Sequence, residues 1–253
     1  MIRRPPRSTL SSSSAASDVY KRQTKNVAYA IIPTEINSKY TIGEYYENGN
    51  FISNLNIPIP GLHNLSNITA AIAASRMIGV DFIEIKKNIK HLKLPKKRFE
   101  FKGQIDERRL YDDYAHHPNE IKETIKLGRL LIQQKHYNEC QKNRLIVIFQ
   151  PHRYSRVKQF TEEFAEELSK ADVIYVTSIY GAGEGNEDKI TSKIITDLIY
   201  KKNKNVSYIN NYYEVTKNFY ELTQKGDLIL NMGAGDCHNF WSILNEKIIK
   251  INH

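Results

Sequence analysis

The sequence predicts an α/β fold in which a mostly parallel sheet carries helices on both faces. First, short apolar segments of strand length alternate with longer segments of helical periodicity after residue 95. Second, reactive side chains gather directly after two of these strands, which is where open α/β sheets place their ligands. Third, the chain has 253 residues, 40% of them hydrophobic, so it can bury a sizeable core in one large or two modest domains.

The elements after residue 95 are expected in a regular order. They begin with a hairpin over residues 98–113, and Pro118 can open the following helix because a first-turn residue needs no N–H. The other strands are expected at 145–149, 173–177, 206–209 and 227–231. The helices are expected at 118–134, 157–170, 192–201 and 213–224, with a last helix that begins near Cys237.

Residues 24–94 are expected to form a separate part of the chain. The patterns indicate strands at 27–32 and 51–57 and an alanine-rich helix at 67–78. Asp81 can cap a second helix, which carries Ile83, Ile85, Ile89 and Leu92. Pro95 then interrupts the pattern, so we expect a domain boundary near Leu94, with the second domain over residues 95–253.

Residues 1–23 differ from the remainder in composition. They are rich in Ser, Arg and Pro and have no hydrophobic period, so we expect a disordered tail. A secretory signal would need an apolar centre that is missing, whereas a transit peptide stays open. We favour a foreign or mistranslated leader that is joined to a truncated gene.

Composition narrows the class of protein. The net charge is +9, from 37 basic and 28 acidic residues, and either an anionic ligand or a lysine-rich solvated surface accounts for it. No nucleic-acid-binding motif and no apolar run of membrane-spanning length occurs in the sequence, so we expect the protein to bind neither nucleic acid nor a membrane. The cysteines, Cys140 and Cys237, are far apart and lack metal-type spacing, which is typical of reduced thiols in a cytoplasmic protein.

Two runs carry the chemistry. The ten residues from Tyr111 to Glu120 hold three carboxylates, two imidazoles and two phenols, a density of titratable groups that favours a functional site. The second run, from Ile146 to Arg156, is an apolar strand that ends in Gln-Pro-His-Arg-Tyr-Ser-Arg. If its loop turns helically, Arg153 and Arg156 share a face and can grip one carboxylate, although an exposed pair of arginines is the simpler alternative.

Two glycine-rich loops follow later strands, at Gly181-Ala-Gly-Glu-Gly185 and Gly233-Ala-Gly-Asp236. Each could wrap an anion, but glycine loops also simply make turns. Earlier in the chain, Pro60-Gly-Leu-His-Asn-Leu-Ser-Asn67 opens a helix, and its asparagines Asn64 and Asn67 could serve as plain caps.

These motifs, together with Lys97-Arg-Phe-Glu100, resemble the Mur ligases in type and in order. Within that family the resemblance is strongest to the members that attach L-alanine to UDP-N-acetylmuramate, and it covers residues 24–253. It implies that residues 24–94 are the last part of a central ATPase domain. It also implies that residues 95–253 form the carboxy-terminal, Rossmann-like domain.

The resemblance implies an ATP-dependent carboxylate–amine ligase of peptidoglycan precursor synthesis, working in the cytoplasm. In that reaction ATP activates the muramyl carboxylate as an acyl phosphate, and the amine of L-alanine attacks it and releases phosphate. Mg²⁺ neutralises the phosphates. Carried over by motif, Arg153, Arg156 and Tyr114 would bind the amino acid.

The resemblance also implies contacts to the nucleotide. Asn64 and Asn67 would hydrogen-bond the adenine, Arg98 would contact the nucleotide from the linker, and Asp113 would accept hydrogen bonds from the ribose hydroxyls. His116 would contact phosphate or orient a neighbour, with a packed histidine as the alternative.

Asp112 is expected to be a solvated or turn residue, because Asp113 sits in the core of the motif. No Gly-x-x-x-x-Gly-Lys-Ser/Thr loop occurs in the sequence, and the family's UDP-sugar domain has no counterpart either. We therefore assign no metal ligand and expect this chain to be inactive by itself. Two alternatives stay open: a murein-tripeptide recycling ligase, which the Pro-His-Arg-Tyr-Ser-Arg loop disfavours, and a non-catalytic nucleotide- or amino-acid-binding fragment.

Overall fold

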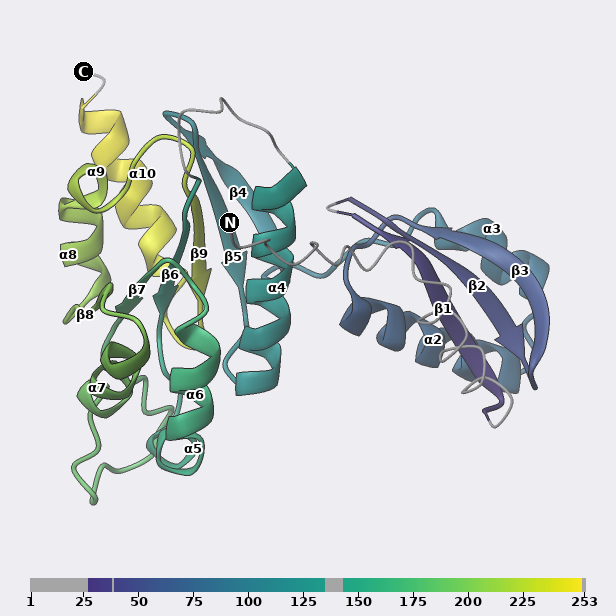
Figure 1. Ribbon diagram of the computed structural model, residues 1–253, viewed down its shortest axis with the longest axis horizontal. Coiled ribbons are helices and arrows are strands. Elements are labelled where there is room, and N and C mark those ends of the chain that lie inside the picture. Colours follow the sequence, from purple (N-terminus) through teal and green to yellow (C-terminus); the bar gives the residue numbers. More distant parts are fainter. Residues whose placement is uncertain (1–26, 38, 135–142, 252–253) are drawn as a thin grey trace, which may run out of the picture. The chain divides into compact units, whose positions relative to one another are not determined.

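The structure is a computed structural model that describes residues 27–37, 39–134 and 143–251 (Figure 1). The leader expected at 1–23 lies outside the described residues, as does Cys140. The chain divides into two compact units with the boundary between Leu94 and Pro95 along the sequence, and each unit is described by itself. None of the helices in the described ranges has the length and apolar character needed to cross a membrane.

The first unit is a three-stranded antiparallel sheet covered by two helices. Its elements in order are β1 (Tyr29–Ile36), β2 (Thr41–Glu47), β3 (Asn50–Ile57), α2 (Leu62–Met77) and α3 (Phe82–Ile89). The side chain of Asp81 accepts a hydrogen bond from the N–H of Ile83 at 2.9 Å, so the predicted cap of the second helix is confirmed.

Strand β2 is missing from the sequence-based prediction. Its residues alternate between buried and partly buried positions, and a two-residue Asn48-Gly49 turn connects it to β3. Both turn residues have positive φ, 48° and 79°, as in the tight hairpins that Asn-Gly favours. That dipeptide is the signal in the sequence that would have revealed the hairpin.

The second unit is built on a six-stranded sheet of order β4-β5-β9-β6-β7-β8. Only β4 (Glu100–Ile105) runs antiparallel, forming the predicted hairpin with β5 (Arg108–Asp113), and all other pairings are parallel. The remaining strands are β6 (Leu145–Phe149), β7 (Val173–Val176), β8 (Val206–Tyr208) and β9 (Leu228–Met232). The predicted fold class is therefore confirmed.

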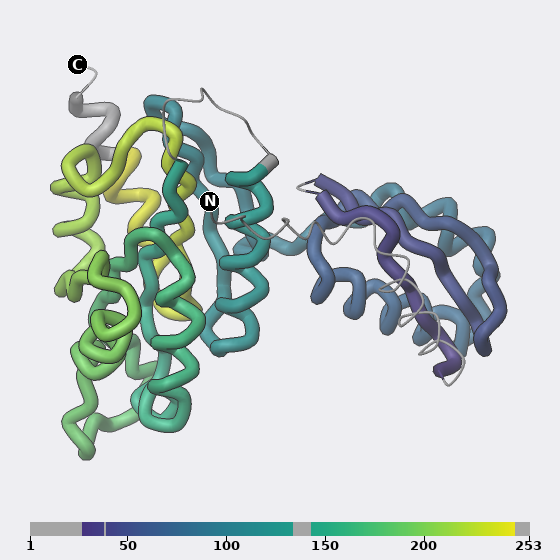
Figure 2. The backbone as a smooth tube through the Cα atoms, in the orientation of Figure 1, coloured from purple at the N-terminus to yellow at the C-terminus, as the bar shows by residue number. Residues whose placement is uncertain are grey.

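Helices cover both faces of this sheet (Figure 1). One face carries α4 (Pro118–Gln134), α5 (Tyr154–Gln159), α6 (Thr161–Leu168) and α7 (Lys193–Lys202). The other carries α8 (Tyr212–Lys217), α9 (Phe219–Leu222) and α10 (Asn239–Ile251). Figure 2 follows the chain through these layers to the first part of α10, in yellow.

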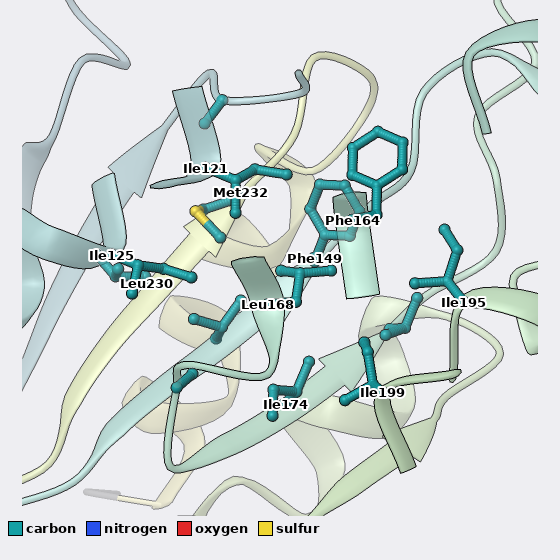
Figure 3. Close-up of a cluster of buried hydrophobic side chains, with 14 of the residues drawn as sticks. Ile121, Ile125, Phe149, Phe164, Leu168, Ile174, Ile195, Ile199, Leu230 and Met232 are labelled. Carbon is teal, nitrogen blue, oxygen red and sulfur yellow. The ribbon is translucent and has the colours of Figure 1, made fainter. Parts of the chain in front are cut away.

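The central strands are buried on both faces, which explains their unbroken apolar sequences. In β6, Val147 and Phe149 pack with the helices of the α4 side, whereas Ile148 packs with those of the α10 side. Figure 3 shows the first cluster, in which Phe164 and Leu168 of α6 contribute to the same core as Phe149.

Two predicted helices are each divided in the structure. The segment predicted as one helix at 157–170 is broken at Phe160, where φ is −119° and ψ is 26°. The Phe160 ring lies 4.8 Å from the His117 ring, centroid to centroid, and packs on the core. The predicted helix at 213–224 is broken in the same way at Asn218. Tertiary packing of the ring, rather than helix propensity, accounts for the first break.

The chain leaves three neighbouring strands in different directions at their carboxyl ends. Strand β9 lies between β5 and β6, but the chain leaves β9 toward α10, whereas it leaves β5 and β6 toward α4 and α5. Ligands of open α/β sheets bind where neighbouring strands part in this way. The candidate site is therefore sought in the loops after β5, β6 and β9.

Candidate functional site

The loops that follow β5, β6 and β9 are tied to one another. The N–H of Gln150 donates to the carbonyl of Met232 at 2.9 Å, and the N–H of Gly233 donates to the carbonyl of Asp113 at 3.1 Å. The side-chain amide of Gln150 donates to the carboxylate of Asp236. These hydrogen bonds join the three loops to one another at the carboxyl edge of the sheet.

The glycines of the 233–236 loop are required by close packing. A Cβ on Gly235 would lie 2.5 Å from Cγ of Tyr180 and 2.6 Å from Oε1 of Gln150. Both distances are too short for non-bonded atoms, so the Tyr180 or Gln150 side chain or the loop backbone would have to move. Gly233 has φ of 158° and its Cβ would lie 3.0 Å from Cβ of Gln150. The backbone of this loop therefore approaches the β6 loop more closely than any other residue type would allow.

Asp113 is buried and anchors the linker that precedes β4. Its side-chain oxygens accept hydrogen bonds from the N–H groups of Phe99 and Ala115, each at 2.7 Å. Phe99 and Lys97 have positive φ, 46° and 60°, a conformation that costs free energy in residues other than glycine. The carboxylate therefore stabilises a strained segment beside Arg98. Burial raises the pKa of Asp113 to about 6, against the lowering effect of the two N–H donors.

This pKa predicts a pH-dependent stability. Between the ordinary value of 3.8 and about 6, the folded state keeps a proton that the unfolded chain loses. Asp113 thus favours folding most below pH 3.8, and this contribution is lost as the pH rises through about 6. The pKa of Asp113 thus differs by about two units between the folded and unfolded states. At about 1.4 kcal/mol per unit, this changes the free energy of unfolding by roughly 3 kcal/mol. ¹³C NMR of the Asp113 carboxyl should give a midpoint near 6, and a midpoint below 4 would contradict this prediction.

Asp112 is neither solvated nor in a turn, so that prediction is wrong. It is the penultimate residue of β5, only 2% exposed, and accepts a hydrogen bond from Nδ2 of Asn231 at 3.0 Å. The same Nδ2 donates to the carbonyl of Cys237 at 2.9 Å. Because side chains alternate along a strand, Asp112 and Asp113 point to opposite faces of the sheet. Asp112 therefore ties β5 to β9 and to the start of α10.

Glu120 organises the loop after β5, although no role is predicted for it from the sequence. Its Oε2 accepts from the N–H groups of His116 and His117 at 3.1 and 3.2 Å, and its Oε1 lies 3.4 Å from Nη1 of Arg98. Burial alone would raise the pKa of Glu120, but the His116 N–H and the nearby positive charges hold it below the ordinary value. Glu120 is the third residue of the helix that begins at Pro118, and a glutamate at this position is the signal that would have predicted the cap.

His116 and His152 bring the two reactive runs together. The rings lie 5.6 Å apart between centroids, although 36 positions separate them in the chain. Nδ1 of His116 lies 2.8 Å from the carbonyl of Tyr114, so it is placed to donate, which leaves Nε2 as the acceptor in the neutral ring. His152 stacks on Tyr180 with centroids 5.6 Å apart and an interplanar angle of 15°.

The arginines of the second run lie beside this histidine pair. Nη1 of Arg156 lies 3.2 Å from Nδ1 of His152, which fits a neutral imidazole that accepts from the guanidinium. Burial lowers the pKa of His152, and the charges of His116, Arg156 and Arg153 lower it further. Arg153 is the N-cap of α5 with φ of 69° and ψ of 131°, whereas Arg156 belongs to the helix itself. Positive φ at an arginine marks a strained loop of the kind found at binding sites.

The asparagines predicted to read the base belong to the first unit. Asn64 is buried and donates from Nδ2 to the carbonyl of Pro60 at 2.7 Å, whereas Asn67 is exposed. Neither is the N-cap of α2, because Gly61 holds that position, so the simple capping interpretation is wrong. No group of three or more His, Cys, Asp or Glu side chains that could hold a metal ion occurs within the described ranges.

Known proteins resemble this chain in sequence and in fold. Residues 97–235 match the family model described as the Mur ligase, glutamate ligase domain. A UDP-N-acetylmuramate–L-alanine ligase from Prochlorococcus marinus subsp. pastoris (strain MED4) is 63% identical over 227 residues, covering 89% of this chain and 48% of that relative. One from Prochlorococcus marinus (strain NATL1A) is 45% identical and covers 88% and 47%. The chain thus spans about half the length of the curated relatives it matches.

Solved structures share the fold. The UDP-N-acetylmuramate–alanine ligase of Thermotoga maritima superposes with a TM-score of 0.70 at 23% identity, over 88% of this chain and 46% of that one. A murein peptide ligase from Psychrobacter arcticus gives 0.64 at 19% identity, over 88% and 44%. The matched domain covers more than half of the sequence, and close relatives extend the match to nearly the whole chain. This chain therefore belongs to the Mur ligase family.

Proposed function

We propose that this chain forms the amino-acid-binding part of an ATP-dependent ligase that joins L-alanine to UDP-N-acetylmuramate. The observation that carries the proposal is the arginine loop. Arg153 and Arg156 stand at the carboxyl edge of the sheet, Arg156 in contact with His152, and the His152 ring lies beside His116 of the other reactive loop. The names of the relatives, up to 63% identical, supply the two substrates, UDP-N-acetylmuramate and L-alanine.

The amino-acid site follows from charge and placement. Two guanidiniums can bind one carboxylate with parallel, charge-assisted hydrogen bonds. Because His152 is held neutral, it engages Arg156 as an acceptor without cancelling its positive charge. Tyr114 is partly exposed and its ring meets the edge of His116 at 5.3 Å, so its phenol is available to the same ligand. Arg153, Arg156 and Tyr114 are the proposed contacts to L-alanine.

The nucleotide contacts are proposed with one refinement. When bound, ATP supplies the phosphoryl group that activates the muramyl carboxylate, with Mg²⁺ neutralising its phosphates. Asn64 and Asn67 are proposed to bind the adenine, and Arg98 the nucleotide. Asp113 already accepts two backbone hydrogen bonds, so a ribose hydroxyl would use a remaining lone pair of its carboxylate.

His116 is proposed to contact phosphate or to orient a neighbour. Its Nδ1 is engaged with the Tyr114 carbonyl, so only Nε2 is left for a ligand. Mg²⁺ is assigned to no residue of this chain, because the sequence has no phosphate-binding loop with its metal ligands. The proposed setting is peptidoglycan precursor synthesis in the cytoplasm.

The test uses a complete ligase, made by placing residues 24–253 after the amino-terminal part of the relative from strain MED4. We expect it to form the alanyl product and phosphate from UDP-N-acetylmuramate, L-alanine and ATP with Mg²⁺. The 253-residue chain alone should release no phosphate, because its sequence has no phosphate-binding loop.

Three results would contradict the proposal. Turnover by the isolated chain near that of the complete ligase would show that the missing loop is not needed. Preference of the complete ligase for the murein tripeptide over L-alanine with UDP-N-acetylmuramate would favour the recycling ligase instead. A complete ligase that binds nucleotide and alanine but yields no product would favour the non-catalytic alternative.

A further inference from the structure

The loop at residues 180–184 braces the arginine loop through its backbone. The N–H of Tyr180 donates to the carbonyl of Pro151, and the N–H of Arg153 donates to the carbonyl of Tyr180, both at 2.8 Å. A Cβ on Gly181 would lie 2.9 Å from Cε2 of Tyr154, so the loop passes directly against that ring. The positive φ of Arg153 is thus held in place by a segment about 30 residues away in the chain.

Glu184 extends this brace with a side-chain contact to helix α5. Its Oε2 accepts from the N–H of Ser155 at 3.0 Å and its Oε1 accepts from Oγ of the same residue at 2.7 Å. Several contacts lower the pKa of Glu184 below its ordinary value, and the hydrogen bond from the Ser155 N–H contributes most. The carboxylate is therefore ionised at neutral pH and grips Ser155 at two atoms.

The helix needs this contact because it has no cap of its own. Residues at the N-cap usually accept a hydrogen bond from a first-turn N–H through a side-chain oxygen. In α5 the N-cap is Arg153, whose guanidinium can only donate, and its side chain makes no capping bond. Glu184 supplies the missing acceptor from another loop and leaves the Arg153 side chain available for a ligand.

We infer that Glu184 is a positioning residue, which holds the first turn of α5 so that Arg153 and Arg156 keep the arrangement that binds the substrate carboxylate. The inference rests on the proposed function. Ser155 lies between the two arginines, so a shift of its backbone moves both guanidiniums. The glycines of the 181–185 segment thus serve a close backbone approach and a sharp turn, with Gly183 at φ of 85°.

The experiment uses the complete ligase described above. Glu184→Ala should raise KM for L-alanine about ten- to a hundredfold, because small misplacements of binding groups have effects of this order. KM for ATP should change by less than about twofold, since no proposed nucleotide contact depends on α5. Glu184→Gln should restore most of the loss, because its Oε1 can accept from the Ser155 N–H while its Nε2 donates to the hydroxyl.

Asp188→Ala is the matched control. Asp188 follows in the same loop and pairs with Lys158 of the same helix at 2.7 Å, but both side chains are exposed. The Asp188→Ala substitution removes one negative charge, as Glu184→Ala does, but leaves the contacts of Ser155 intact. KM for L-alanine and KM for ATP should therefore both stay unchanged. In the 253-residue chain itself, Glu184→Ala should also accelerate amide hydrogen exchange at Ser155, and Asp188→Ala should not.

The outcomes separate this inference from the proposed function. If Arg156→Ala raises KM for L-alanine but Glu184→Ala does not, the positioning role is overturned and the amino-acid site stands. If Glu184→Gln is as impaired as Glu184→Ala, the effect is one of charge and the hydrogen-bonded brace is overturned. If neither arginine substitution affects L-alanine, the amino-acid site itself fails, and this inference fails with it. A parallel loss of kcat and of ATP binding in Glu184→Ala would indicate a general collapse and also overturn it.

Discussion

Replacing Arg153 or Arg156 by alanine in the complete ligase is expected to raise KM for L-alanine more than KM for ATP. A charge-assisted contact to a carboxylate contributes on the order of 1.5–3 kcal/mol. At about 1.4 kcal/mol per decade, this is roughly a tenfold to hundredfold loss of affinity. Asp113→Ala should show the opposite preference, because its proposed partner is the ribose of ATP.

Lys158→Ala is the control for long-range charge. Lys158 lies on the same helix as Arg156, is largely exposed and pairs with Asp188. Its replacement removes one positive charge but no proposed contact, so KM for L-alanine should stay within about twofold. Because Michaelis constants report affinity only when substrate release outpaces chemistry, equilibrium binding of L-alanine is measured in parallel. Arginine variants that weaken ATP alone would show that the assigned roles are wrong.

Asp227→Ala is expected to have the largest effect on stability. The Asp227 side chain is 0% exposed and binds Arg144 through two contacts, 3.0 Å to Nε and 2.7 Å to Nη2. It also accepts from the N–H of Gln224 at 2.7 Å. Arg144 and Asp227 directly precede β6 and β9, so the pair joins the amino ends of two neighbouring central strands. Breaking a fully buried ion pair typically costs about 3–5 kcal/mol, and because Arg144 is 28% exposed we expect a loss of about 2–3 kcal/mol here.

The measurement is urea unfolding followed by the fluorescence of Trp241. This is the single tryptophan of the sequence, it is 8% exposed, and it lies on α10 in the same unit as Asp227. Its signal therefore reports the second unit even if the first unfolds separately. Glu166→Ala, which removes the partner of exposed Lys202, is the matched acidic control and should change stability by less than about 0.5 kcal/mol. Equal effects of the two substitutions would contradict the assigned role of the buried pair.

Local sequence patterns were sufficient for much of the fold. The central strands β6 and β9 are buried on both faces, so their apolar runs are distinctive, and their alternation with amphipathic segments predicts a parallel sheet. The hairpin of β4 and β5, the helix that opens at Pro118 and the Asp81 cap were also predictable. Each of these features depends on residues close together in the chain. Strand β2 was missed even though its Asn48-Gly49 turn was a local signal.

Other features depend on contacts between distant segments, which a local pattern does not contain. The break at Phe160 comes from packing of its ring on the core and His117. The burial of Asp112 depends on Asn231, which is 119 residues away. No property of either neighbouring aspartate reveals which one faces the α10 side.

The candidate site likewise combines features that the sequence reveals with features that depend on contacts between distant segments. Its residue types, Asp113, His116, Arg153 and Arg156, stand out in the sequence because titratable groups cluster after strands. Their arrangement was decided by the tertiary structure: β9 inserts between β5 and β6, the two histidines meet, and Glu184 reaches Ser155 across 29 positions. The sequence by itself therefore identified which titratable side chains are candidates for the site. Only the packing of the chain decided which of them hold the others in place, because that role depends on distances between segments rather than on residue type.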